Sequence, residues 1–221
     1  DQLKGGTPVF ALSRPEGIFL FGVGQGMSKI FEIYDRHAFA ALGHPVDIEK
    51  IRQSAIEAAH LEGFNRSPQD VTLRRLISFA LSPTLKSSFE QIFSPPIMVE
   101  AIFAEVGESP EHDVLARLHY DGNHAYETSG VLVAHTDPKR EEEAAAWLRQ
   151  SLGPEDSLGQ VAGACMLAWR TLTDDKPFAD LAPSGDLPLK TNGRVAETAL
   201  LDRRARAASR YRTLSHAALN A

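Results

Sequence analysis

The sequence predicts an α+β fold with four layers, in which two antiparallel β-sheets stack face to face and helices flank both outer faces. The expected elements run in the order strands, two helices, strands, two helices, strands, which differs from the strict alternation of a doubly wound sheet. Some expected strands, such as residues 18–23, are continuous apolar runs and indicate strands covered on both sides. The length of 221 residues suits one domain.

The first half of the chain predicts four strands and then two helices. The strands are expected at residues 8–13, 18–23, 29–33 and 37–43, with turns at residues 14–17 and 34–36. Apolar residues at helical spacing predict the first helix over residues 46–60, and Gly63 is expected to end it. A capping Ser67 followed by Pro68 predicts the start of the second helix, which Pro83 should kink or restart.

The second half repeats this order. Strands are expected at residues 98–106, 114–120 and 131–134, helices after Asp137 and after Asp156 or Ser157, a hairpin at 195–201 and 205–212, and a short helix at 214–219. We expect residues 1–221 to form one domain, with a short N-terminal segment at 1–6, a loop at 174–192 and a C-terminal helix or tail at 213–221.

Composition excludes several classes of function. The net charge of −6 gives no bulk argument for nucleic acid or an anionic membrane as a partner. A lone cysteine, Cys165, excludes an internal disulfide and a Cys-rich zinc site, and favours a reducing, cytoplasmic setting. No apolar stretch approaches the ~18–20 residues of a membrane span, and residues 1–6 have no signal-peptide pattern. We expect no cofactor.

One block of sequence is specific. Residues 29–43 read Lys-Ile-Phe-Glu-Ile-Tyr-Asp-Arg-His-Ala-Phe-Ala-Ala-Leu-Gly, and this closely resembles a segment of the α-type subunits of actinobacterial-type proteasomes. Three weaker stretches agree in the correct order: residues 70–72, residues 98–107 leading to 120–122, and residues 195–202 before an arginine-rich segment. The resemblance covers about residues 4–219 and implies the Ntn-hydrolase fold, the four-layer αββα sandwich of proteasome subunits.

The resemblance also implies a function. Such subunits form seven-membered outer rings on rings of catalytic β-type subunits, gate the entry of unfolded protein substrates, and dock an ATP-driven unfoldase of the AAA+ class. The chain is then expected to be a non-catalytic component of a threonine endopeptidase complex in the bacterial cytoplasm.

The resemblance assigns an activator-binding pocket to three residues. The lysine that opens this strand in the family lies at a pocket between neighbouring subunits and pairs with the terminal carboxylate of the activator, which places Lys29 in that role. An ammonium ion suits the task, because it is a compact charge with three donors. Gly6 and Gly43 fall where the family has pocket glycines, which let a peptide tail approach the backbone. Otherwise, Lys29 is a solvated lysine at a strand end.

A second hypothesis makes the chain a self-processing hydrolase, either a β-type peptidase or an amidase. Gly5-Gly6-Thr7 imitates the junction at which β-type subunits expose their threonine nucleophile, with Lys29 as the accompanying lysine. The family's catalytic subunits place an aspartate sixteen positions later, where this chain has Val23. The alternative for Thr7 is the start of the first strand. A third hypothesis is a ring-forming scaffold without a protease partner.

Two other groups of residues have the residue types of a metal or nucleic-acid site. His112, His119 and His124 lie close in sequence but lack a fourth ligand, so we expect no metal site. The segment after residue 202 holds Arg203, Arg204, Arg206, Arg210 and Arg212. Only Tyr211 accompanies these arginines as an aromatic platform, so a solvated or subunit-contact strand is expected rather than an RNA site.

Overall fold

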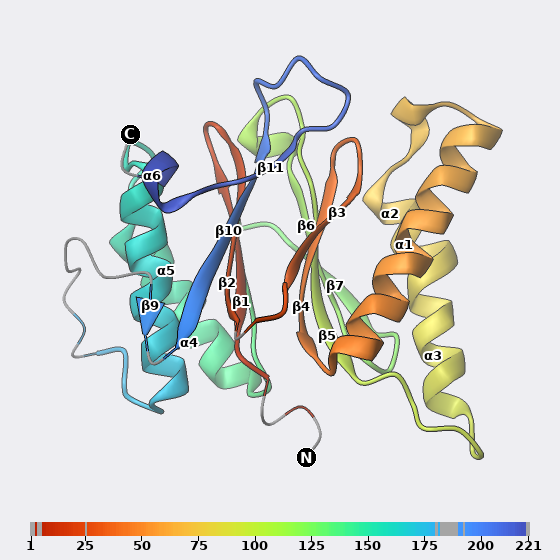
Figure 1. Cartoon of the computed structure of the whole chain (residues 1–221), viewed down its shortest axis with the longest axis horizontal. Helices are drawn as coiled ribbons and strands as arrows, with labels where there is room; N and C mark the ends of the chain where they lie inside the picture. Colours follow the sequence, from red (N-terminus) through yellow and green to blue (C-terminus); the bar gives the residue numbers. More distant parts are fainter. Residues whose placement is uncertain are drawn as a thin grey trace.

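The structure, a computed structural model, describes Leu3 and residues 6–24, 26–179, 181, 190–191 and 193–219. It confirms the predicted fold class: two antiparallel sheets lie face to face between two helical layers (Figure 1). The predicted segments 1–6, 174–192 and 213–221 lie partly outside the described residues.

The first sheet has the strand order β11-β10-β2-β1-β8, and β9 also pairs with β10. Its strands are β1 (Val9–Arg14), β2 (Gly17–Gly24), β8 (Val131–Ala134), β9 (Lys190–Thr191), β10 (Arg194–Asp202) and β11 (Tyr211–Thr213). The second sheet has the order β3-β4-β5-β6-β7. Its strands are β3 (Ile30–Tyr34), β4 (His37–Gly43), β5 (Val99–Glu105), β6 (Val114–Leu118) and β7 (His124–Glu127). Every strand pair in both sheets is antiparallel.

Each sheet carries its own helical layer. The helices over the first sheet are α4 (Pro138–Ser151), α5 (Leu158–Thr173) and the short α6 (His216–Leu219). Those over the second sheet are α1 (Pro45–Asn65), α2 (Leu73–Leu76) and α3 (Ser82–Glu90), with a π-helical turn, η2 (Ile77–Leu81), between the last two. This turn ends at Leu81, and α3 begins at Ser82 with Pro83 in its first turn, which confirms that the helix restarts at the proline.

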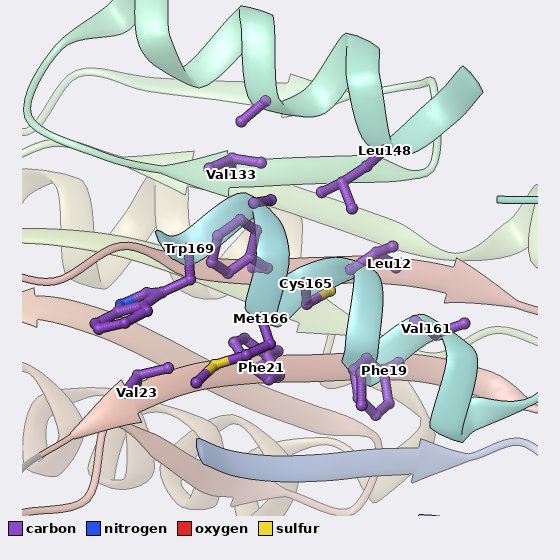
Figure 2. Close-up of a cluster of buried hydrophobic side chains, with 14 of the residues drawn as sticks. Leu12, Phe19, Phe21, Val23, Val133, Leu148, Val161, Cys165, Met166 and Trp169 are labelled. Atoms are coloured by element: carbon purple, nitrogen blue, oxygen red, sulfur yellow. The ribbon is translucent and has the colours of Figure 1, made fainter. Parts of the chain in front are cut away.

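Three apolar layers follow from the alternation of side chains along the strands. Large aromatic residues such as Phe10, Phe19 and Phe21 point towards the helices, where they pack around Cys165 of α5 (Figure 2). Between the sheets the strands contribute many small residues, among them Ala11, Ala38, Ala40, Ala104 and Ala199. Small side chains let the two sheets approach closely, and larger residues such as Leu20 and Leu42 fill the rest of this layer.

Two predictions about the helices were wrong in detail. Gly63 lies inside α1, where a Cβ atom would stand 2.4 Å from the Tyr34 hydroxyl, so this glycine serves packing rather than termination. Ser67-Pro68 begins only a 3₁₀ turn, η1 (Pro68–Asp70), and α2 starts at Leu73. The buried Glu105 carboxylate accepts the Leu73 N–H at 2.7 Å and so supplies the cap from a distant strand.

Three strand predictions also needed correction. β7 was missed because its sequence, His-Ala-Tyr-Glu, is partly polar and exposed at a sheet edge. β9 lies in the stretch expected to be a loop. β11 covers only the last two residues of the expected second strand of the last hairpin, and residues 205–210 form a bend and irregular chain. The choice between Asp156 and Ser157 is also decided, since Ser157 and Gln160 form a capping box for α5.

Candidate functional site

The three residues predicted to form a binding pocket lie close together. The Lys29 carbonyl accepts a hydrogen bond from the Ala41 N–H at 3.0 Å, next to the end of β4. Gly6 packs against Leu42, since a Cβ atom on Gly6 would stand 2.8 Å from Leu42 Cδ1. Gly43 is the last residue of the same strand. The fold therefore brings Gly6, Lys29 and Gly43, which are far apart in sequence, to one end of β4.

Lys29 connects the two sheets. It directly precedes β3, and its carbonyl is bound to β4, so its backbone belongs to the second sheet. Its backbone N–H instead donates to Glu197 Oε2 on β10 of the first sheet, at 2.7 Å. The side chain is partly buried and runs alongside Gly22 of β2. Lys29 is thus an anchored lysine between the sheets, and not the solvated strand-end lysine of the alternative interpretation.

The charge environment of Lys29 is mixed. Burial lowers the pKa of its ammonium group, the Glu197 carboxylate acts to raise it, and Arg194 acts to lower it. Glu197 shares the face of β10 that carries Ala199 and Leu201 between the sheets. Arg194 instead lies over the Trp169 ring, with its guanidinium carbon 5.7 Å from the ring centroid. Glu197 is therefore the group that favours the charged lysine.

Contacts within the chain account for the two pocket glycines, and at Gly43 the backbone conformation itself requires glycine. Gly43 has φ +148°, and a Cβ atom there would stand 2.6 Å from the Met98 carbonyl oxygen. Gly6 donates its N–H to the Leu3 carbonyl at 2.9 Å, in addition to its contact with Leu42. Packing within the chain therefore explains both glycines, and their contact with a partner peptide stays a prediction.

A surface hollow of about 340 Å³ adjoins this region. The Gly24–Ser28 side contributes Met27, which is exposed, and β10 contributes Val195 and Glu197. The lining of the hollow is partly apolar and includes Glu197, which accepts the Lys29 N–H, but it does not include Lys29, Gly6 or Gly43 themselves.

Thr7 is arranged differently from a threonine nucleophile. Its hydroxyl donates a hydrogen bond to the Val23 carbonyl at 2.7 Å, sixteen residues along the chain. The Val23 side chain is fully buried among apolar residues beneath α5. The position where a catalytic subunit carries an acid therefore supplies a backbone acceptor and no carboxylate.

The three histidines considered as metal ligands have separate neighbours. His119 Nδ1 lies 2.8 Å from Glu100 Oε2, and His112 Nδ1 lies 2.9 Å from the Ser109 hydroxyl. His124 packs edge-on against Tyr126. Within the ranges that the structure describes, no group of three or more His, Cys, Asp or Glu side chains is placed to hold a metal ion.

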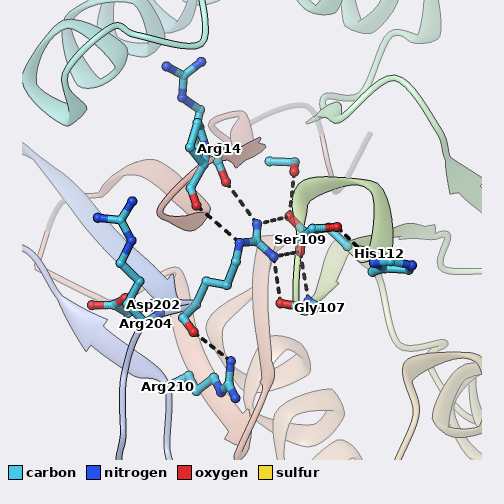
Figure 3. A network of polar contacts seen from close by, with 11 residues as sticks. Arg14, Gly107, Ser109, His112, Asp202, Arg204 and Arg210 are labelled. Carbon is cyan, nitrogen blue, oxygen red and sulfur yellow. Dashed lines mark hydrogen bonds and ion pairs between the residues drawn. The ribbon is translucent and has the colours of Figure 1, made fainter.

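The expectation of a solvated or subunit-contact strand was wrong for Arg203, which is buried and bound within the chain. Its side chain is 8% exposed and pairs with Asp113, which is 2% exposed, through two N–H···O bonds of 2.9 Å. It also donates to the carbonyls of Gly107 and Arg14, so one guanidinium joins three turns at the same end of the sandwich (Figure 3). The Arg210 side chain donates in turn to the Arg203 carbonyl. This part of the cluster is structural.

Glu197 and Gly22 are the residues of the candidate site that sequence reasoning missed. Glu197 lies in the block of residues 195–202, and Gly22 lies in the expected strand of residues 18–23. Glu197 is 168 residues from Lys29, and no local pattern indicates which carboxylate will face a lysine across two sheets.

Comparison with known proteins gives a consistent result, although no family model matches the chain. A protein of Arthrobacter sp. (strain FB24) named proteasome subunit alpha is 34% identical over 203 residues, covering 90% of this chain and 82% of that protein. A protein of the same name from Geodermatophilus obscurus is 33% identical over 216 residues, covering 97% of this chain and 71% of that protein.

Over a shorter stretch the identity is higher. The proteasome subunit alpha of Actinosynnema mirum is 41% identical over 121 residues, which is 53% of this chain but less than half, 45%, of that protein. None of the helices that the structure describes is long and apolar enough to cross a membrane. Because the similarity extends over most of the chain and most of two of these relatives, the chain belongs to the proteasome subunit alpha family.

Proposed function

We propose that this chain builds the outer ring of a bacterial proteasome core particle in the cytoplasm. The observation that carries the proposal is the similarity of almost the whole chain to proteins named proteasome subunit alpha. In this function seven copies form a ring that stacks on β-type subunits, controls the entry of unfolded proteins and docks an ATP-dependent unfoldase. The chain acts as one domain and needs no cofactor for this task.

Lys29 is proposed to receive the terminal carboxylate of the unfoldase at a pocket between neighbouring subunits, with Gly6 and Gly43 beside it. Three features support this role: the lysine is anchored at both backbone groups, its side chain is partly buried, and a partly apolar hollow adjoins it. A partly buried ammonium ion binds a carboxylate more strongly than a solvated one, because less water screens the pair.

Native mass spectrometry of the purified protein, alone and with a candidate β-type subunit, tests the assembly. We expect an intact chain in seven- or fourteen-membered assemblies that capture the β-type subunit. A chain shortened by residues 1–6 would indicate self-cleavage and the hydrolase hypothesis with Thr7 as nucleophile. Intact rings that never bind a β-type subunit would favour the scaffold hypothesis.

A lysine substitution tests the docking site. In Lys29→Ala, the unfoldase-stimulated rate of protein degradation, divided by the unstimulated rate, is expected to fall at least about tenfold, because the partner carboxylate loses its counter-charge. The matched control is Lys139→Ala, since Lys139 is an exposed lysine on α4, in the other helical layer. Equal stimulation in wild type and Lys29→Ala, with rings of the same size, would remove Lys29 from the docking site.

A further inference from the structure

Glu197 accepts the backbone N–H of Lys29 and also favours the charged form of the lysine side chain. In an antiparallel pair, two directly opposed residues of the hydrogen-bonded kind exchange both of their N–H···O bonds. Lys29 is directly opposite Ala41 when the β3–β4 register is continued by one residue. Only one bond of such a pair is formed here, from the Ala41 N–H to the Lys29 carbonyl at 3.0 Å. The Lys29 N–H turns away from β4 and donates to Glu197 Oε2 at 2.7 Å. This hydrogen bond therefore links the start of β3 to the first sheet.

The lysine side chain has space on this face because of Gly22. Gly22 lies directly opposite Glu197 in the pairing of β2 with β10. A Cβ atom on Gly22 would stand 3.5 Å from Lys29 Cβ and 3.6 Å from Lys29 Cδ. The aliphatic stem of Lys29 thus covers the bare backbone of Gly22, beside the strand that carries Glu197.

Within the part of the chain that the structure describes, two charged side chains and burial act on the ammonium group of Lys29. Burial and Arg194 both disfavour the ammonium form, and Glu197 favours it. Tyr211 of β11 faces the same region, with its hydroxyl donating to the Ile30 carbonyl at 3.3 Å. Burial, together with Glu197 and Glu32, raises the pKa of Tyr211 to about 12, so this group is neutral near pH 7. Among these groups, Glu197 alone supports the positive charge of Lys29.

We propose that Glu197 is the positioning residue of the carboxylate-binding lysine, which it holds in place through the backbone N–H while placing a negative charge next to it. The inference rests on the proposed function in assigning the carboxylate of a partner to Lys29. Its two parts are separable, because a glutamine at position 197 keeps an oxygen that accepts the N–H but removes the charge.

The test measures the protonation of Lys29 in the assembled protein. Trace labelling with acetic anhydride modifies only neutral amines, and peptide mass spectrometry gives the rate at Lys29 as a function of pH. In Glu197→Gln the Lys29 ammonium group should lose its proton at lower pH than in wild type. At a fixed pH below the midpoint of the Lys29 titration, its labelling rate should therefore be about tenfold higher than in wild type. Glu197→Asp retains the charge and should return the rate towards that of wild type.

Two controls isolate the effect. Glu57→Gln removes the same charge from an exposed position on α1 and should leave the Lys29 rate unchanged. Lys139, which is exposed, should label at one rate in every variant and serves as the internal standard. A Lys29 rate in Glu197→Gln that stays within twofold of both wild type and Glu57→Gln would overturn the inference.

Peptide binding separates this inference from the proposed function. The probe is an eight-residue peptide copied from the C-terminus of an ATP-driven unfoldase, compared with the same peptide amidated at its C-terminus. The free-acid peptide should bind wild type, and in Glu197→Gln its binding should be lost at lower pH than in wild type. If labelling responds to Glu197 but neither peptide binds, the inference about the lysine stands and the docking function fails.

Discussion

Replacing Arg203 by alanine is expected to lower the free energy of unfolding by about 3–5 kcal/mol. The reason is that Asp113, whose side chain is 2% exposed, would keep its charge but lose both guanidinium bonds. Its remaining donors are the Gly107 N–H and the Ser13 hydroxyl. The same change removes the bonds from Arg203 to the carbonyls of Gly107 and Arg14, which join three turns.

Thermal and denaturant unfolding at one fixed protein concentration measure this effect, since assembly contributes to apparent stability. The matched control is Arg206→Ala, because Arg206 is an exposed arginine of the same segment and should change stability by at most about 0.5 kcal/mol. Arg203→Lys keeps the charge but lacks the two-pronged donor and should fall between them. Equal stability of Arg203→Ala and Arg206→Ala would contradict the assignment of a structural ion pair.

Replacing Gly17 by alanine is expected to cost at least about 3 kcal/mol and to reduce the yield of folded protein. Gly17 has φ +148°, which side chains rarely adopt, and an added Cβ atom would stand 1.9 Å from the Leu201 carbonyl oxygen. This oxygen belongs to the backbone of β10, which pairs with β2 along its whole length. Relief of the clash therefore requires separation of two central strands.

Gly26→Ala is the matched control for this substitution. Gly26 also has a positive φ, +80°, but an added Cβ atom would meet nothing within 4 Å among the described residues. Its cost should be limited to the backbone term of about 1–2 kcal/mol. Circular dichroism and unfolding curves of both variants give the comparison. A Gly17→Ala protein as stable as Gly26→Ala would show that the two strands can move apart without loss.

Local signals explain why much of the fold was predictable. The turn at Gly17, the β3–β4 hairpin and the capping box at Ser157 each depend on residues within a few positions of one another. The perturbation before Pro83 follows likewise from the missing N–H of proline. The order of such elements, read along the chain, already favours two stacked sheets with outer helices.

Sequence blocks also located the candidate site. Residues 29–43 indicated the family and singled out Lys29 and Gly43, which the fold places at the same end of β4. Some local signals led to wrong predictions, because the same residues can serve a different structural role. Gly63 has the form of a helix terminator but accommodates the Tyr34 hydroxyl, and the polar β7 carries too little apolar pattern to indicate a strand.

By itself the sequence determined the family, the type and order of most elements, and the lysine at the centre of the candidate site. Only the tertiary structure decided which distant residues contact one another. These pairs are Leu201 with Gly17, Asp113 with Arg203, and Glu197 with Lys29. The physical reason is separation along the chain. These partners are 90 to 184 residues apart, and contacts between distant segments, within one sheet or between the two, depend on strand register and sheet stacking, which no short stretch of sequence specifies.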